Sequence, residues 1–263
     1  MRSRVCTSLV DAFIALNQLK KAGGLCKMVD NLKGFNEVCG SAGFDDEIDR
    51  KALCELLCCC AKNAPERPSA CVTAVLWDVE DRMQNGGYFK ADAPYRTDGS
   101  LITSRLNPDR ATHAKPGGSR IPDVVVVNDP SKPPTIGNVR RVYEMKIGDD
   151  DFTNILGPDG KTQLDAFKKL FGDLLYQDKS GYQALTDENC GCKDDDDDNG
   201  GDGLLSRAKA HADELARQQS AEFTKAAKAL AVPVLRAASQ IPGPIGAAAR
   251  VLGLGMGAAS LAN

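Results

Sequence analysis

Three ionisable residues occupy segments that are otherwise apolar. Asp123 directly precedes the four valines 124–127, and Glu144 and Lys146 are two positions apart in "VYEMKI", residues 142–147. Because side chains alternate between the two faces of a strand, Glu144 and Lys146 would share one face, opposite an apolar one. Two carboxylates can hold a hard divalent cation, and an ammonium beside them can act on a nearby anion. The set therefore indicates metal-assisted chemistry on a phosphate ester.

Phosphodiester hydrolysis explains each residue type. It needs a divalent ion that neutralises charge on the phosphoryl oxygens and supplies hydroxide near neutral pH, and Mg²⁺ or Mn²⁺ prefers carboxylate ligands. Asp123 and Glu144 on neighbouring strands could converge on such an ion, with the carbonyl of Met145 as a backbone ligand. The ammonium of Lys146 could orient the attacking water or stabilise the transition state. Glu80, on a preceding helix, could complete the metal shell.

A structural alternative needs no chemistry. In it, Asp123 only starts a turn, and Glu144 and Lys146 form an exposed pair on an edge strand, worth less than ~1 kcal/mol. Three features favour the site. The valine run predicts a buried central strand, the loop to the next strand is short, and a helix led by Gln163 follows.

Apolar periodicity and turn formers predict the elements that would position these residues. Helices are expected over residues 5–22, 46–62, 71–85, 162–176 and 204–231, and strands over 121–127 and 139–147. Residues 88–118, mostly polar and rich in turn formers, are expected to form loops. The order of helix, strand, strand and helix predicts an α/β (α+β) fold, in which a small mixed sheet is flanked by helices.

Composition limits how a polyanion could be held. The chain has 263 residues, 42% hydrophobic and 26% charged, with a formal net charge of −3. This excludes a global basic field, so a nucleic acid must be held by a local patch or through metal ions. The candidate phosphate contacts near the site are Arg120, Lys132, Arg140, Arg141 and His113. For each of them a solvated charge without a role is the open alternative.

Ten cysteines are present, and Cys58, Cys59 and Cys60 are adjacent. Adjacent cysteines on one helix are not expected to pair all at once, which favours a reducing compartment over a disulfide framework. Two alternatives remain open. Zinc could bind among Cys54, Cys58, Cys60, Cys190 and Cys192, or Cys190 could form a disulfide with a distant partner.

Neither end of the chain predicts a membrane segment. Asp11 and Asn17 interrupt the apolar part of a possible signal peptide. The apolar tail 241–263 contains Arg250, two prolines and several glycines, so a buried or partner-covered helix is expected there and no membrane span.

The run "RIPDVVVVNDPSKPPTIGNVRRVYEMKIGDDDF", followed by "TQLDAFKKLFGD", resembles the VRR-NUC branch of the PD-(D/E)xK nucleases. It is most similar to bacterial toxin versions delivered by type VI secretion, over about residues 72–175. The resemblance implies that Asp123, Glu144 and Lys146 are catalytic, that Gln163 supports the site and that Glu80 contributes from the helix. Relatives tend to have tyrosine four residues after the glutamine, where this chain has Phe167.

The resemblance also implies a function and a domain plan. It implies a DNase that uses Mg²⁺ or Mn²⁺, an antibacterial effector neutralised by an immunity protein, made in the bacterial cytoplasm and secreted into a recipient's cytoplasm. The alternatives are a DNA repair or phage replication nuclease and a non-enzymatic adaptor with a degenerate nuclease fold. The plan is a helical region 1–68, a nuclease domain 69–188, an acidic linker 189–203 and a helical region 204–263. The terminal helices could bind a secretion component or a chaperone.

Overall fold

The computed structural model describes residues 6, 8–22, 44–84, 86–103, 117–146, 162–178, 181–192, 203–218 and 220–221. The chain forms two compact units, Met1–Ala212 and Asp213–Asn263. The first unit holds all the labelled helices and strands, and it is a mixed α+β fold with a small sheet, as the predicted class requires. The predicted domain boundaries stay predictions.

A three-stranded antiparallel sheet forms the centre of this unit. Its strands are β1 (Phe89–Ala91), β2 (Val124–Val127) and β3 (Val139–Tyr143), in the order β1-β2-β3. The four valines of β2 have no exposed surface, because β2 is flanked by strands and covered on both faces. The prediction of a buried central strand is confirmed.

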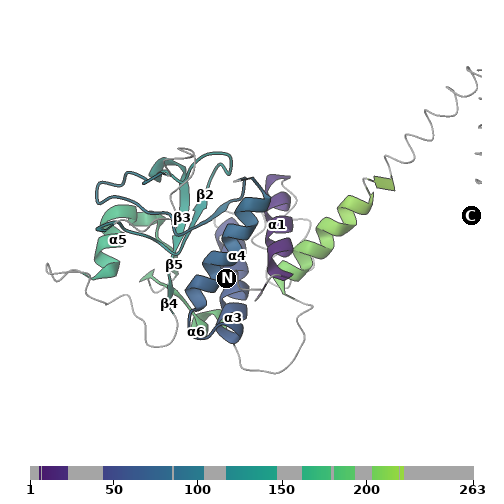
Figure 1. Ribbon diagram of the computed structural model, residues 1–263, viewed down its shortest axis with the longest axis horizontal. Helices are drawn as coiled ribbons and strands as arrows, with labels where there is room; N and C mark the ends of the chain where they lie inside the picture. Colours follow the sequence, from purple (N-terminus) through teal and green to yellow (C-terminus); the bar gives the residue numbers. More distant parts are fainter. Residues whose placement is uncertain are drawn as a thin grey trace, which may run out of the picture. The chain divides into compact units, whose positions relative to one another are not determined.

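Helices cover both faces of this sheet (Figure 1). On one face lies α5 (Gln163–Phe171), whose Phe167 and Phe171 pack with Val125 and Val142. On the other face lie α1 (Ser8–Lys21), α3 (Phe44–Asn63) and α4 (Pro68–Arg82). Three contacts fix that second layer: Phe13 packs edge-on against Phe89, the Trp77 indole donates to the Ala91 carbonyl, and the Tyr143 hydroxyl donates to the Asp46 carbonyl.

Helix α5 begins and ends on clear local signals. The Thr162 side chain accepts from the Asp165 N–H while the Asp165 carboxylate accepts from the Thr162 N–H, a capping box that satisfies amides at the helix start. Gly172 follows the helix with φ of 51°, a conformation that other residues rarely adopt. The predicted helix therefore stops at Phe171, and a 3₁₀ turn, η2 (Gly172–Leu174), replaces its last turn.

The strand predicted over 139–147 is divided at Glu144. After β3 ends, β4 (Met145–Lys146) pairs in parallel with β7 (Leu185–Thr186), and the Leu185 N–H donates to the Glu144 carbonyl at 2.7 Å. The pattern missed β1, β5 (Gln177–Asp178), β6 (Gly181–Tyr182), β7 and α6 (Asp187–Cys190). Elements of two to four residues are too short to show a hydrophobic period.

Four disulfides join α3 to the rest of the unit. They are Cys6–Cys59, Cys54–Cys190, Cys58–Cys192 and Cys60–Cys71. The expectation that adjacent cysteines cannot all pair is wrong. Successive helical residues point roughly 100° apart, so Cys58, Cys59 and Cys60 reach the segment after α6, the segment before α1, and α4. Cys26 and Cys39 lie outside the described residues.

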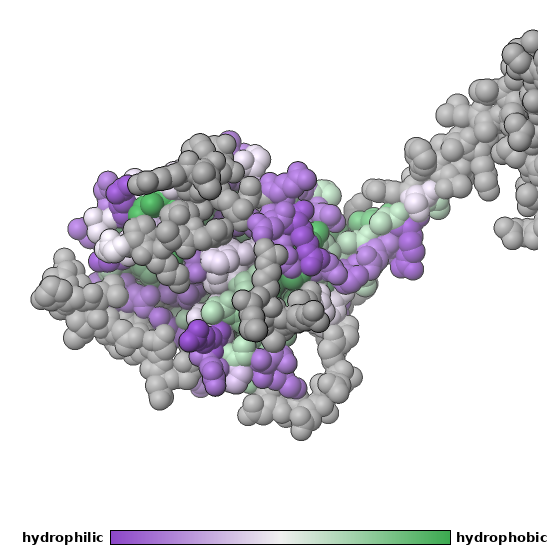
Figure 2. Space-filling view, in the orientation of Figure 1, coloured by the Kyte–Doolittle hydropathy of each residue, from purple (hydrophilic) through white to green (hydrophobic). Residues whose placement is uncertain are grey.

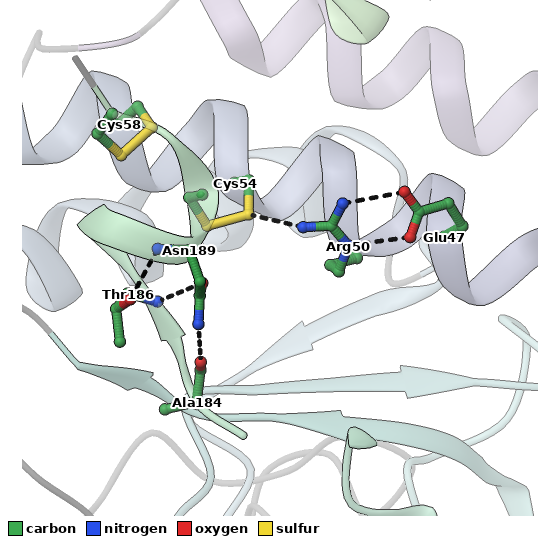
Figure 3. Close-up of a disulfide and its surroundings, with 9 residues drawn as sticks. Glu47, Arg50, Cys54, Cys58, Ala184, Thr186 and Asn189 are labelled. Carbon is green, nitrogen blue, oxygen red and sulfur yellow. Dashed lines mark hydrogen bonds and ion pairs between the residues drawn. A yellow bond between two sulfur atoms is a disulfide. The ribbon is translucent and has the colours of Figure 1, made fainter. Parts of the chain in front are cut away.

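Two of these disulfides hold α6, as Figure 3 shows for Cys54 and Cys58. Cys54 also lies beside Arg50, which forms a bidentate ion pair with Glu47. Asn189 caps α6 with Thr186 and donates to the Ala184 carbonyl, so the helix is continuous with β7. The alternative in which Cys190 forms a disulfide with a distant cysteine is confirmed, and residues 189–192 of the predicted linker belong to this ordered structure.

Among the described residues no helix is long and apolar enough to cross a membrane. On the face drawn in Figure 2 the coloured surface is mainly hydrophilic, with hydrophobic residues in scattered patches. Residues 204–218 are helical, as predicted. The end of that predicted helix, the apolar tail and the acidic run 194–198 lie outside the described residues.

Candidate metal centre

Asp123 and Glu144 are joined by reciprocal hydrogen bonds. The Met145 N–H donates to Asp123 Oδ2 at 2.7 Å, and the Asp123 N–H donates to Glu144 Oε1 at 3.2 Å. Each carboxylate therefore accepts a hydrogen bond from a backbone N–H of the segment that carries the other carboxylate. The register explains why they meet, since Val124 pairs with Tyr143 and so the residues beside that pair, Asp123 and Glu144, lie next to each other.

Burial makes this carboxylate pair electrostatically costly. Glu144 is 2% exposed and Lys146 is 9% exposed. Burial, and then the charge of Asp123, raises the pKa of Glu144 well above its usual value, while Lys146 opposes the shift. Burial also raises the pKa of Asp123, against the lowering effects of the Met145 N–H and Lys146. An exposed pair on an edge strand is therefore excluded, because both charged groups are buried beside a second carboxylate.

Gln163, the first residue of α5, reaches this pair. Its Nε2 donates to Glu144 Oε2 at 3.2 Å, so both oxygens of Glu144 have a donor. The resemblance implied only that Gln163 supports the site. In the structure it holds the carboxylate, which fixes the orientation of Glu144.

Asp92 is a member of the site that sequence reasoning missed. It follows β1 directly, its N–H donates to the Asp123 carbonyl at 3.1 Å, and its charge contributes to the raised pKa of Asp123. Its φ is 51°, an uncommon value for a residue other than glycine. Asp92 lies in the stretch predicted as loops, and neither a period nor a motif marks it.

Glu80 lies in α4 and is bound by a lysine. The Lys90 Nζ is 3.1 Å from Glu80 Oε1, and the two side chains are 6% and 8% exposed respectively. A buried ion pair of this kind accounts for the burial of Glu80 without a metal ion. The predicted place of Glu80 in the metal shell stays a prediction.

The predicted phosphate contacts Arg140 and Arg141 are engaged elsewhere. Arg140 pairs with Asp45 at 2.6 Å and with Asp49, and Arg141 pairs with Asp46 at 2.5 Å, all at the start of α3. A guanidinium held by carboxylates must give them up before it can bind phosphate, and the predicted role of both arginines stays a prediction.

The other predicted contacts are less constrained or undescribed. Lys132 is exposed and lies 3.0 Å from Asp129, and Arg120 is partly buried, with its backbone paired to Tyr95. His113 lies outside the described residues. Arg120 and Lys132 stay predictions.

The donor set fits a hard divalent cation. Asp123, Glu144 and the nearby Asp92 offer carboxylate oxygens, and Met145 offers a backbone carbonyl between Glu144 and Lys146, which suits Mg²⁺ or Mn²⁺ better than softer ions. Burial outweighs the lowering effect of Lys146 on the pKa of both Asp123 and Glu144. A cation would supply the missing positive charge.

In comparisons with known proteins, no protein-family model, no curated protein and no solved structure matches this chain. The function must therefore be argued from the site itself.

Proposed function

We propose that this protein is a metal-dependent nuclease that hydrolyses DNA phosphodiester bonds, of the VRR-NUC type within the PD-(D/E)xK nucleases. The observation that carries the proposal is the pair of Asp123 and the buried Glu144, whose carboxylates accept from the Met145 and Asp123 N–H groups respectively, with Lys146 close to both. The succession of α4, the strands β1 to β4 and α5 supports it, because the run that carries the resemblance predicts strands between two helices.

The roles of the residues follow from their positions. Asp123, Glu144 and the Met145 carbonyl would hold Mg²⁺ or Mn²⁺, which when bound provides a hydroxide near neutral pH and neutralises phosphoryl charge. Lys146 would place its ammonium against the attacked phosphate or the attacking water. Gln163 keeps Glu144 in one orientation through the bond to Oε2.

The biological setting rests on the resemblance and on charge. We infer an antibacterial effector, made in a bacterial cytoplasm, neutralised there by an immunity protein and delivered to a recipient cell. Because the net charge is −3, DNA would have to be held by a local basic patch or through the cation of the site. The four disulfides add a condition, since such bonds form and persist in oxidising compartments. We therefore infer that the protein passes through an oxidising compartment on its way to the recipient cell.

A plasmid-cleavage assay tests the proposal. Purified protein with Mg²⁺ or Mn²⁺ is expected to nick and linearise supercoiled DNA, and EDTA is expected to stop the reaction. Glu144→Gln should lower the rate by about 10²-fold or more, because a buried amide cannot replace a carboxylate ligand. The matched control is Glu188→Gln, an exposed glutamate in α6, which should cleave like the wild type.

Equal melting temperatures for the two glutamine variants would show that the fold is kept. Intact plasmid with either metal ion, or equal rates for wild type and Glu144→Gln, would contradict the proposal. Expression in bacteria separates the biological alternatives. An effector should damage the chromosome unless its immunity protein is present, whereas a repair nuclease should be tolerated.

A further inference from the structure

Two of the disulfides lie against each other. Cys6–Cys59 and Cys60–Cys71 meet where the segment before α1, helix α3 and helix α4 come together. The sulfur atoms of Cys6, Cys60 and Cys71 all lie within 4.8 Å of one another, and that of Cys59 is bonded to Cys6. Four sulfur atoms therefore form one cluster.

The cluster has the donors and spacing of a zinc site. Tetrahedral zinc bound to thiolates has Zn–S bonds of about 2.3 Å, which places the sulfur atoms about 3.8 Å apart. The Cys6 sulfur lies within 4.8 Å of those of Cys60 and Cys71, about an ångström from that spacing, and the two bonded pairs would move apart to it after reduction. Cys6, Cys60 and Cys71 are buried, so an ion there would be shielded from water.

We propose that, in the reduced chain, Cys6, Cys59, Cys60 and Cys71 bind one zinc ion, which formation of the two disulfides expels. This set differs from the cysteines for which the sequence suggested zinc, most of which pair α3 with the α6 region instead. The proposal does not depend on the nuclease function.

The exchange balances in electrons and protons. Two equivalents of a dithiol reductant supply four electrons and four protons, which convert the two disulfides into four thiols. Zinc binding then displaces the four thiol protons, because the ligands are thiolates. Oxidation by two equivalents of a small-molecule disulfide removes four electrons from the thiolates, forms both S–S bonds and releases Zn²⁺. The small-molecule disulfide is reduced to four thiolates, which take up four protons from solvent.

Under this proposal, the segment before α1, helix α3 and helix α4 stay tied together in both redox states. Disulfides tie the α1 segment, α3 and α4 together under oxidising conditions, and zinc would tie them under reducing ones. By contrast, Cys54–Cys190 and Cys58–Cys192 would simply open on reduction, because among the described residues their sulfur atoms are not part of the cluster.

Zinc analysis of reduced protein tests the proposal. The chain, produced in a reducing cytoplasm and purified with a phosphine reductant and no chelator, is expected to carry about one zinc ion per molecule by elemental analysis. Cys60→Ser with Cys71→Ser should lose it, and the matched pair Cys54→Ser with Cys190→Ser should keep it. Oxidised glutathione should release the zinc in step with loss of free thiols.

Cobalt substitution guards against a variant that loses zinc by unfolding. Co²⁺ added to reduced wild type should give the thiolate-to-metal charge-transfer absorption and visible bands of a tetrahedral sulfur site. Reduced wild type without zinc and without these bands would overturn the proposal. So would zinc that is lost from the Cys54 and Cys190 pair variant, or zinc that stays in the fully oxidised chain.

Discussion

Lys146→Met is expected to slow DNA cleavage by about 10²–10³-fold, the usual cost of removing one group that stabilises developing charge. Lys146 is 9% exposed and is close enough to Asp123 and Glu144 to lower the pKa of both. A methionine of similar length fills the same space without the ammonium. Since the carboxylates remain, Mn²⁺ binding should be retained while the rate falls.

This separation of binding from rate distinguishes a catalytic lysine from a structural one. Single-turnover cleavage gives the rate, and a titration with Mn²⁺ gives the affinity. Lys62→Met, at an exposed position near the end of α3, is the matched control and should behave like the wild type. Unchanged cleavage by Lys146→Met would remove Lys146 from the mechanism.

Asp49→Ala is expected to destabilise the protein by about 3–5 kcal/mol, because it leaves the buried Lys20 ammonium without its counter-charge and removes one partner of Arg140. Asp49 has no exposed surface. Its Oδ1 lies 2.5 Å from the Lys20 Nζ of α1, and its Oδ2 is bound by Arg140 of β3. One carboxylate thus joins α1, α3 and β3, the strand that leads to Glu144.

The neighbouring Asp45 provides a control of the same charge. It also pairs with Arg140, but its side chain is 51% exposed, so Asp45→Ala should cost less than about 1 kcal/mol. Urea unfolding of the oxidised proteins measures both free energies. Equal losses for the two variants would show that the ion pairs of Asp49 do not hold the helices to the sheet.

Sequence patterns predicted what is long or chemically marked. The helices α1, α3, α4 and α5 have apolar stripes, and β2 is an unbroken run of valines. The pattern of apolar residues was therefore enough to predict whether each of these elements is a helix or a strand. Asp123, Glu144 and Lys146 were found because their charges interrupt apolar segments, and the structure brings the two carboxylates together.

What the sequence could not predict depends on pairing across the chain. The acidic start of α3 suited a helix N-terminus, and nothing local showed that Asp46 and Asp49 would bind the arginines of β3. Asp92 lies in the site because the chain turns with a positive φ at Asp92, directly after the three-residue strand β1. Cysteine pairing depends on the direction in which each residue of α3 points, which spacing along the chain does not reveal.

Mn²⁺ binding to the oxidised wild type and to Glu144→Gln tests most directly whether Asp123 and Glu144 form a cation site. Titration calorimetry should show binding to the wild type and an affinity at least about tenfold weaker for the variant, since even residues that only support metal ligands change affinity by 10–100-fold. Glu188→Gln should bind like the wild type. Equal affinities for wild type and Glu144→Gln would contradict the metal centre, and with it the nuclease mechanism.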